Sequence, residues 1–206
     1  MALVKLNNRG VRSATTFGSI SALGEMRFIK KQTASSSATI SFVDGTSDVV
    51  LDNTYKEYLF TFNNIHPETN GVSFGFQGNA SGGSGYNETM TTTIFKAGHG
   101  EDGSGAGINY ETGADQAQGT GFQQIVRYVG NGNDESCSGY LHLFNPSSTT
   151  FVKHFIARTV MYHASDEAED CFTAGYFNTT SAIDEIQFKM SSDDIDAGDI
   201  CLYGIN

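Results

Sequence analysis

The chain has 206 residues, a length that a single all-β domain commonly fills. It is acidic, with 23 Asp and Glu residues against 12 Lys and Arg residues and a formal net charge of −11. Because affinity for a phosphate backbone comes from cationic side chains, we expect no nucleic acid partner. No apolar run in the sequence has the length needed to cross a bilayer, so we expect no membrane insertion.

The apolar content is concentrated in aromatic residues. The chain contains 15 Phe and 9 Tyr, whereas 24 Gly and only 2 Pro indicate many turns with positive φ. Aromatic residues favour strands, so the composition predicts a β-protein with a core of Phe and Tyr. Three cysteines, Cys137, Cys171 and Cys201, are widely spaced and odd in number, which predicts free, buried thiols and no disulfide framework.

The first 24 residues show no regular apolar period and are predicted to form an N-terminal arm or a first edge segment. Residues 25–206 are predicted to form a single β-sandwich domain. At its start, an apolar run around Phe28 and another over residues 38–42 flank a serine-rich stretch. This pattern predicts two strands joined by a turn.

The strongest predicted strand spans Tyr55 to Ile65. Three aromatic residues alternate along it and share one face: Tyr58, Phe60 and Phe62. Pro67 is expected to end the strand. The Asn-Gly pair at residues 70–71 is a turn signal, and the run Val72 to Phe76 resumes the alternation. The two runs therefore predict a hairpin.

Seven further strands are predicted downstream, each bounded by Gly, Asn or Pro. They are Thr89–Phe95, Phe122–Val129, Tyr140–Phe144, Phe151–Met161, Phe172–Phe177, Ile183–Met190 and Asp199–Ile205. The acidic piece Ser165–Asp170 is predicted to form a single helical turn. The glycine-rich stretches Asn79–Gly85 and Gly98–Gly121 are predicted to be exposed loops.

Many short strands without helices for parallel crossovers predict an all-β fold with antiparallel pairing. Two sheets packed face to face hide both apolar faces, so the expected architecture is an antiparallel two-sheet sandwich, jelly-roll-like. An up-and-down barrel and an immunoglobulin-like sandwich are the alternatives. The absence of Trp from the sequence disfavours the immunoglobulin-like fold.

Candidate catalytic and metal motifs are weak. The five histidines form no HxH or HExxH pattern: His66, His99, His142, His154 and His163. No Gly-x-Ser-x-Gly elbow lies between a strand and a helix. The acidic run Asp193–Asp199 matches a calcium loop only in part, because the bidentate Glu is missing, and we interpret it as a solvated turn before the last strand. We therefore predict no enzyme activity, no catalytic or metal-binding residue and no cofactor.

Aromatic side chains near the glycine-rich loops suggest a second class of function. Tyr86, Tyr110 and Tyr128 lie near these loops, where tyrosine rings can stack on sugar rings. This is the basis for an alternative interpretation as a carbohydrate-binding module for a host surface glycan. A glycan hydrolase working through paired loop carboxylates is a third and weaker interpretation.

Whole segments of the chain resemble a known group of proteins. They are LVKLNNRGVRSATTFGSISALGEMRFIKK, YKEYLFTFNNIHPET, SGYLHLFNPSSTTFVKHF, AGYFNTTSAIDEIQFKMSS and DIDAGDICLYGIN. Together these segments span most of the chain. They resemble virion structural proteins of marine tailed phages, particularly cyanophages, and the ending with LYGI resembles the closing strand of phage tail-fibre modules.

The resemblance implies a location on the virion, after synthesis in the host cytoplasm. It implies a capsid decoration or cement protein on the head surface, or alternatively a tail or tail-fibre component, assembled as a homotrimer. The partners would be the major capsid protein or tail proteins of the same particle. The family supplies no catalytic residues to carry over. Tail fibres are usually much longer than this chain, which favours the head surface.

The predicted arm suits such an assembly, because a segment without a regular apolar period gains order by packing on a neighbour. Its apolar residues are the predicted anchors to a neighbouring subunit: Leu3, Val4, Leu6, Val11 and Phe17.

Overall fold

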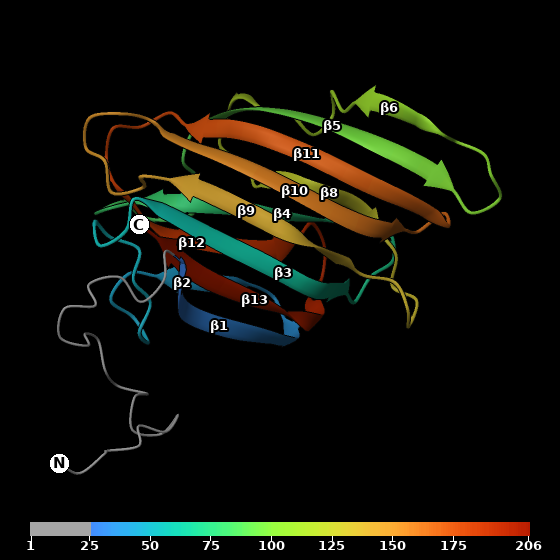
Figure 1. The fold of residues 1–206 in the computed structure, drawn as a ribbon, viewed down its shortest axis with the longest axis horizontal. Helices are drawn as coiled ribbons and strands as arrows, with labels where there is room; N and C mark the ends of the chain where they lie inside the picture. Colours follow the sequence, from blue (N-terminus) through green and yellow to red (C-terminus); the bar gives the residue numbers. More distant parts are fainter. Residues whose placement is uncertain (1–25) are drawn as a thin grey trace, which may run out of the picture.

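The computed structural model describes residues 26–206, which form thirteen β-strands and no helix (Figure 1). The strands are β1 (Met26–Ser37), β2 (Ile40–Val43), β3 (Glu57–Pro67), β4 (Val72–Ala80), β5 (Met90–Gly100), β6 (Gly107–Tyr110), β7 (Ala117–Gly119), β8 (Gln123–Val129), β9 (Cys137–Phe144), β10 (Lys153–His163), β11 (Glu167–Phe177), β12 (Ile183–Met190) and β13 (Ile195–Ile205). The strand pairs are antiparallel. The prediction of an all-β fold is confirmed.

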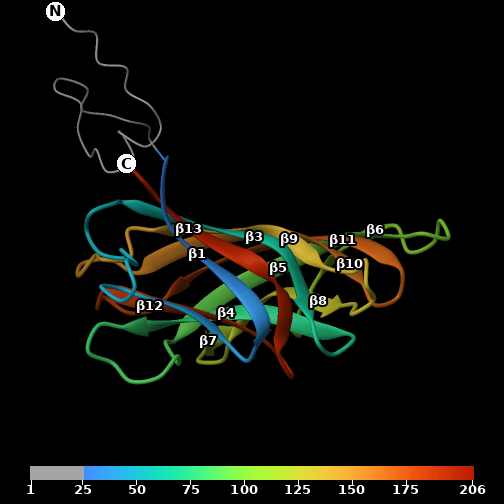
Figure 2. The same cartoon turned by 90° about the horizontal axis from the view of Figure 1, so that it is seen from below.

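The strands lie in two layers that belong to one continuous sheet (Figures 1 and 2). The first layer has the order β1-β13-β3-β9-β10-β11-β5, with β6 and β7 on the far edge of β5, and the second has the order β8-β4-β12-β2. A single residue pair, His163 with Val129, joins β10 to β8. On the opposite side, the Gln32 side chain of β1 donates a hydrogen bond to the Ser41 carbonyl of β2 at 2.6 Å.

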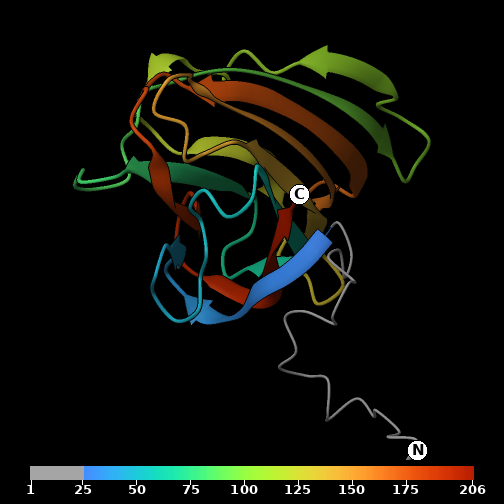
Figure 3. The same ribbon diagram turned by 60° about the vertical axis from the view of Figure 1, so that its left-hand side comes forward.

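The sheet therefore curls into a nearly closed, barrel-like shape (Figure 3). The jelly-roll sandwich of two separate sheets is not confirmed, because the two layers stay connected through hydrogen bonding between β8 and β10. Alternation along a strand predicts that it has a buried face, but it contains no information on whether neighbouring layers share an edge.

The predicted core strand is correct. Tyr58, Phe60 and Phe62 of β3 are each at most 1% exposed, and β3 ends at Pro67. The Tyr58 hydroxyl donates to the Asp52 carbonyl at 3.0 Å and accepts from the Asp52 amide at 3.1 Å. Burial of this side chain raises the pKa of Tyr58 to about 12.

The predicted hairpin of β3 and β4 is wrong. β3 pairs with β13 and β9, whereas β4 pairs with β12 and β8. The two strands face each other across the core instead, and the rings of Phe62 and Phe74 meet edge to face with centroids 5.3 Å apart. Two alternating runs joined by a turn can pair by hydrogen bonds or stack across a core, and the periodicity is the same in both cases.

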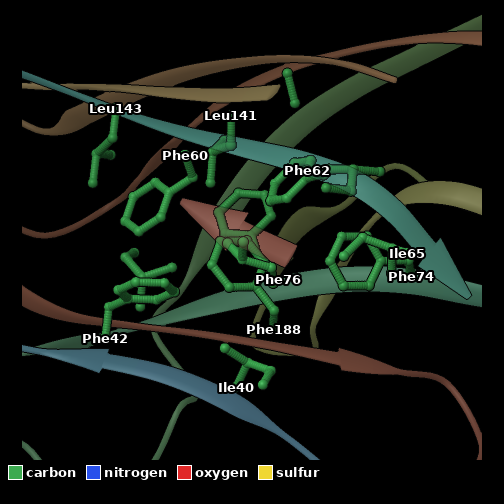
Figure 4. Packing of buried hydrophobic residues seen from close by; sticks show 14 of the residues in the cluster. Ile40, Phe42, Phe60, Phe62, Ile65, Phe74, Phe76, Leu141, Leu143 and Phe188 are labelled. Atoms are coloured by element: carbon green, nitrogen blue, oxygen red, sulfur yellow. The ribbon is translucent and has the colours of Figure 1, made fainter. Parts of the chain in front are cut away.

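Phe188 of β12 lies at the centre of the core (Figure 4). Its ring has five aromatic neighbours at centroid distances of 5.3–6.4 Å, and they come from both layers. These neighbours are Phe42, Phe60, Phe62, Phe74 and Phe76. Mostly edge-on aromatic contacts therefore join the layers, and such pairs add about 0.5–1.5 kcal/mol each beyond area burial.

The predicted helical turn at residues 165–170 is also wrong. β11 begins at Glu167 and continues the ladder with β10. The acidic character of this stretch has a structural cause, since the Glu169 side chain is buried and contacts Lys96 Nζ at 2.5 Å. The last strand begins at Ile195 and not at Asp199, so part of the acidic run lies in β13. The glycine-rich stretch after residue 98 contains β6 and β7.

The predicted N-terminal arm lies outside the described residues, and so do its predicted anchors Leu3, Val4, Leu6, Val11 and Phe17.

The Phe188 cluster generates a stability prediction. Replacing Phe188 with Ala removes a fully buried ring and its contacts to both layers, so the free energy of unfolding should fall by about 3–5 kcal/mol. Urea denaturation followed by circular dichroism measures this change. The matched control is Phe151→Ala, because Phe151 is 69% exposed, and it should change stability by less than about 0.5 kcal/mol. Equal losses in the two variants would contradict the central role of Phe188.

Candidate interaction surface

The outer face of the first layer carries large apolar side chains that the described chain leaves uncovered. β10 alternates strictly between buried and exposed residues, with Ile156, Arg158 and Val160 pointing outward. Because side chains alternate along every strand, the cross-strand partners of these residues also point outward. We call this surface, formed by the outward residues of β1, β13, β3, β9, β10, β11, β5 and β6, the outer face.

One row of cross-strand partners crosses five strands of the outer face, and we call it the aromatic row. In order from β6 to β9, it contains Tyr110, Phe95, Phe172, Arg158 and Tyr140. The rings of Phe95 and Phe172 stack with centroids 4.8 Å apart and planes 3° apart. The Arg158 guanidinium lies 4.7 Å from the centroid of the Phe172 ring. Phe172 is thus flanked by Phe95 and Arg158.

A second row runs parallel to the aromatic row. In order from β1 to β10, it contains Phe28, Tyr203, Leu59, His142 and Ile156. Phe28 is 60% exposed, and its ring meets that of Tyr203 edge to face at 5.7 Å. Ile156 is 48% exposed.

Two shallow hollows flank Ile156. One, of about 310 Å³, lies toward the aromatic row, and the other, of about 420 Å³, lies toward Tyr176 and Phe144. Thr93, Ile156 and Ala174 line both hollows. Ala174 sits in register between Ile156 and Thr93, so small side chains separate the larger ones in this part of the sheet.

Charged groups on the outer face occur next to groups of opposite charge. Arg158 Nη2 lies 2.7 Å from Asp170 Oδ2, and Lys31 Nζ lies 3.1 Å from Asp199 Oδ2. Hydrogen bonds from Thr33 and then from Lys31 lower the pKa of Asp199, which stays ionised. Glu57 and His142 are also neighbours, with Oε2 and Nε2 2.8 Å apart. The charges of the two ion pairs cancel.

The rest of the described chain is strongly acidic by comparison. Residues 26–206 contain nine Lys and Arg residues against 22 Asp and Glu residues, a formal charge of −13. The outer face therefore combines little net charge with exposed apolar area in a chain that is acidic elsewhere.

In the second layer, β4 is covered on its outer side by the chain itself. All nine residues of β4 are buried. The Gln77 amide donates to the carbonyls of Glu88, Thr120 and Gly121 at 2.9–3.1 Å, which fixes two connecting segments over β4. β4 thus differs from the strands of the first layer, whose outward aromatic side chains have no such cover within residues 26–206.

A buried charge network lies beneath the edge of the outer face. Lys96 of β5 contacts Glu169 of β11 at 2.5 Å and Glu111 at 3.7 Å, and Arg127 of β8 contacts Glu111 at 2.5 Å. Burial lowers the pKa of Lys96, but the two carboxylates outweigh this effect and the net change is upward. The network connects strands β5 and β11 to β8. This structural role is enough to explain why the four charged residues are present.

The three tyrosines predicted to contact a glycan lie on different elements. Tyr110 of β6 is 52% exposed, and its hydroxyl donates to Asp115 at 2.8 Å. Tyr128 at the end of β8 is 42% exposed, and Arg127 lies 4.8 Å from its ring centroid. Tyr86 in the β4–β5 connection is partly buried, and this burial is the largest cause that raises its pKa. Tyr110 belongs to the aromatic row, and the glycan contact stays a prediction.

Among residues 26–206, no group of three or more His, Cys, Asp or Glu side chains is placed to hold a metal ion. In that same part of the chain, no helix has the length and apolar character to span a membrane.

Comparison with protein-family models, with curated proteins and with solved structures found no match. The resemblance to phage virion proteins therefore stays a prediction from the sequence.

Sequence reasoning missed the outer face as a unit. Phe95 and Phe172 stand in different predicted strands, and nothing in either run indicates that they stack. The strict alternation of residues 153–161 could have indicated this face. Ile156 and Val160 lie on the same side of the strand as Arg158, whereas Phe155 lies on the buried side.

The three cysteines generate a prediction about reactivity. Cys137, Cys171 and Cys201 are free and buried; burial raises the pKa of Cys137 and raises that of Cys171 to about 12. Since the thiolate is the reactive form, none of the three should react with Ellman's reagent at about pH 8 while the protein is folded. All three should react after denaturation in guanidinium. Fast labelling of the folded protein would contradict the burial of these thiols.

Proposed function

We propose that this protein is a non-enzymatic structural protein of a tailed-phage virion, a decoration or cement protein on the head surface, that works by binding other proteins through its outer face. The observation that carries the proposal is the exposed apolar surface of the first layer. Contiguous apolar patches larger than a few hundred Å² usually mark an interaction site. The assignment to a phage particle comes from the sequence resemblance.

The arrangement of the rings favours a protein partner over a sugar at the centre of the outer face. A sugar stacks on an open ring face. The Phe172 ring instead stacks against the Phe95 ring and lies under the Arg158 guanidinium, so its faces are already in contact with protein groups. Ring edges and aliphatic side chains such as Ile156 and Val160 suit packing against another apolar surface.

A carbohydrate-binding role keeps one supporting observation. Tyr110 combines an exposed ring with a hydroxyl bonded to Asp115, a pairing of aromatic and carboxylate groups that also suits sugar recognition. A glycan array separates the two functions: specific binding that is lost in Tyr110→Ala supports the module, and the absence of binding supports a purely architectural role.

The head-surface proposal predicts the copy number. Quantitative mass spectrometry of purified particles should find hundreds of copies of this chain per virion, because decoration proteins follow the capsid lattice. A handful of copies would indicate a tail or tail-fibre component instead. Complete absence from the particle would overturn the proposal.

The predicted arm supplies a second test on particles. Deletion of residues 1–20 should abolish incorporation, because it removes Leu3, Val4, Leu6, Val11 and Phe17 while leaving residues 26–206 intact. Circular dichroism of the truncated protein controls for folding. Normal incorporation of a folded, truncated protein would refute the anchoring role of the arm.

A further inference from the structure

We propose that the outer face is a self-association interface, so that the partner packed on it is a second copy of this chain. The inference rests on the proposed assembly function and names its partner. Three properties of the outer face support this inference: its exposed apolar area, its charge, and the shape of its surface.

The exposed apolar area approaches what an interface between subunits needs. Six side chains of β5, β6, β9 and β10 on the outer face are 38–76% exposed: Phe95, Ile108, Tyr110, Tyr140, Ile156 and Val160. A large side chain has a total area of about 200 Å², so six side chains that are on average about half exposed present on the order of 600 Å² to solvent. This already equals the upper end of the range for the largest patch on a typical monomer, about 300–600 Å². The half-buried ring of Phe172 brings it closer to the roughly 800 Å² per partner of a standard interface.

The charge distribution favours a partner as acidic as this chain, and a second copy meets that condition. Two copies of residues 26–206, each with a formal charge of −13, repel each other across most of their surfaces. The outer face avoids this repulsion, because the ion pairs Arg158–Asp170 and Lys31–Asp199 cancel their own charges. A basic partner would gain more from the acidic surfaces elsewhere, whereas an acidic partner with the same neutral face fits here.

The surface shape of the outer face is compatible with packing against the same face of a second copy. Ile156 stands between the two hollows, and Thr93 and Ala174 line both of them. When identical faces meet, the Ile156 side chain of each copy can enter a hollow of the other. Identical patches on both partners give an isologous contact, in which every stabilising pair occurs twice. Such a contact pairs two copies, so it is distinct from the contacts of the homotrimer that the sequence resemblance implies.

Sedimentation velocity and native mass spectrometry of the full 206-residue chain test the proposal. The wild-type chain should have at least twice the mass of 22.1 kDa at micromolar concentrations. Ile156→Glu and Val160→Glu each bury an unpaired carboxylate in the apolar interface, so each should raise the dissociation constant by at least about tenfold. Both positions are about half exposed, and unchanged circular dichroism would verify that the variants fold.

The matched control is Phe151→Glu. Phe151 is 69% exposed but lies in the connection between β9 and β10, away from the two rows, so this variant adds the same charge and should keep the wild-type mass. If Phe151→Glu dissociates as readily as the two face variants, net charge and not the outer face controls association, which overturns the proposal.

Further outcomes separate this inference from the proposed function. A wild-type chain that stays at 22.1 kDa overturns self-association, and so does an oligomer that both folded face variants retain. Suppose that the wild-type chain is a monomer that is still incorporated into particles, and that Ile156→Glu abolishes this incorporation. The outer face then contacts a different virion protein, and only the self-association inference fails. If the chain self-associates through the outer face but is absent from particles, only the proposed function fails.

Discussion

The packing of aromatic rings around Phe188 is the interaction on which the rest of the structure depends. Phe188 contacts rings from β2, β3 and β4, and so connects both layers of the curled sheet. A sheet that is nearly but not fully closed has few hydrogen bonds between the edges of its two layers. β8 pairs with β10 at one residue pair. Side-chain packing in the core must therefore hold the layers at their separation, which explains why so much of the Phe content lies there.

This core also determines what remains outside. Once Phe60, Phe62 and Phe155 point inward, the alternation of each strand sends its other residues outward. In the second layer, connecting segments held by Gln77 cover those residues. In the first layer, the charge network of Lys96, Glu111, Arg127 and Glu169 lies beneath the edge, and the outer face stays exposed within residues 26–206. The open face is the surface through which we propose that the protein assembles.

Much of the strand content could be predicted from the sequence. The run Ile183–Met190 coincides with β12, and the aromatic alternation of residues 55–65 identified the core strand β3. Errors arose where two structures share one local pattern. The β3 and β4 runs stack across the core and do not pair as a hairpin. The acidic piece at 165–170 begins a strand that pairs with β10 and β5, and half-buried Lys96 forms an ion pair with its buried Glu169. The candidate site was foreseen only at Tyr110, which was expected to bind a glycan.

The sequence by itself determined the secondary structure class and, for the strands it predicted, which residues share a face, because alternation is a local property of the extended chain. It also determined the acidic charge and the concentration of apolar area in aromatic rings. Only the tertiary structure decided which outward residues become neighbours. Phe95, Phe172, Arg158 and Tyr140 come from four strands, and the pairing order β9-β10-β11-β5 aligns them. β9, β10 and β11 follow one another along the chain, whereas β5 lies far ahead of them. That order depends on how all thirteen strands share one core, and no local pattern contains this information.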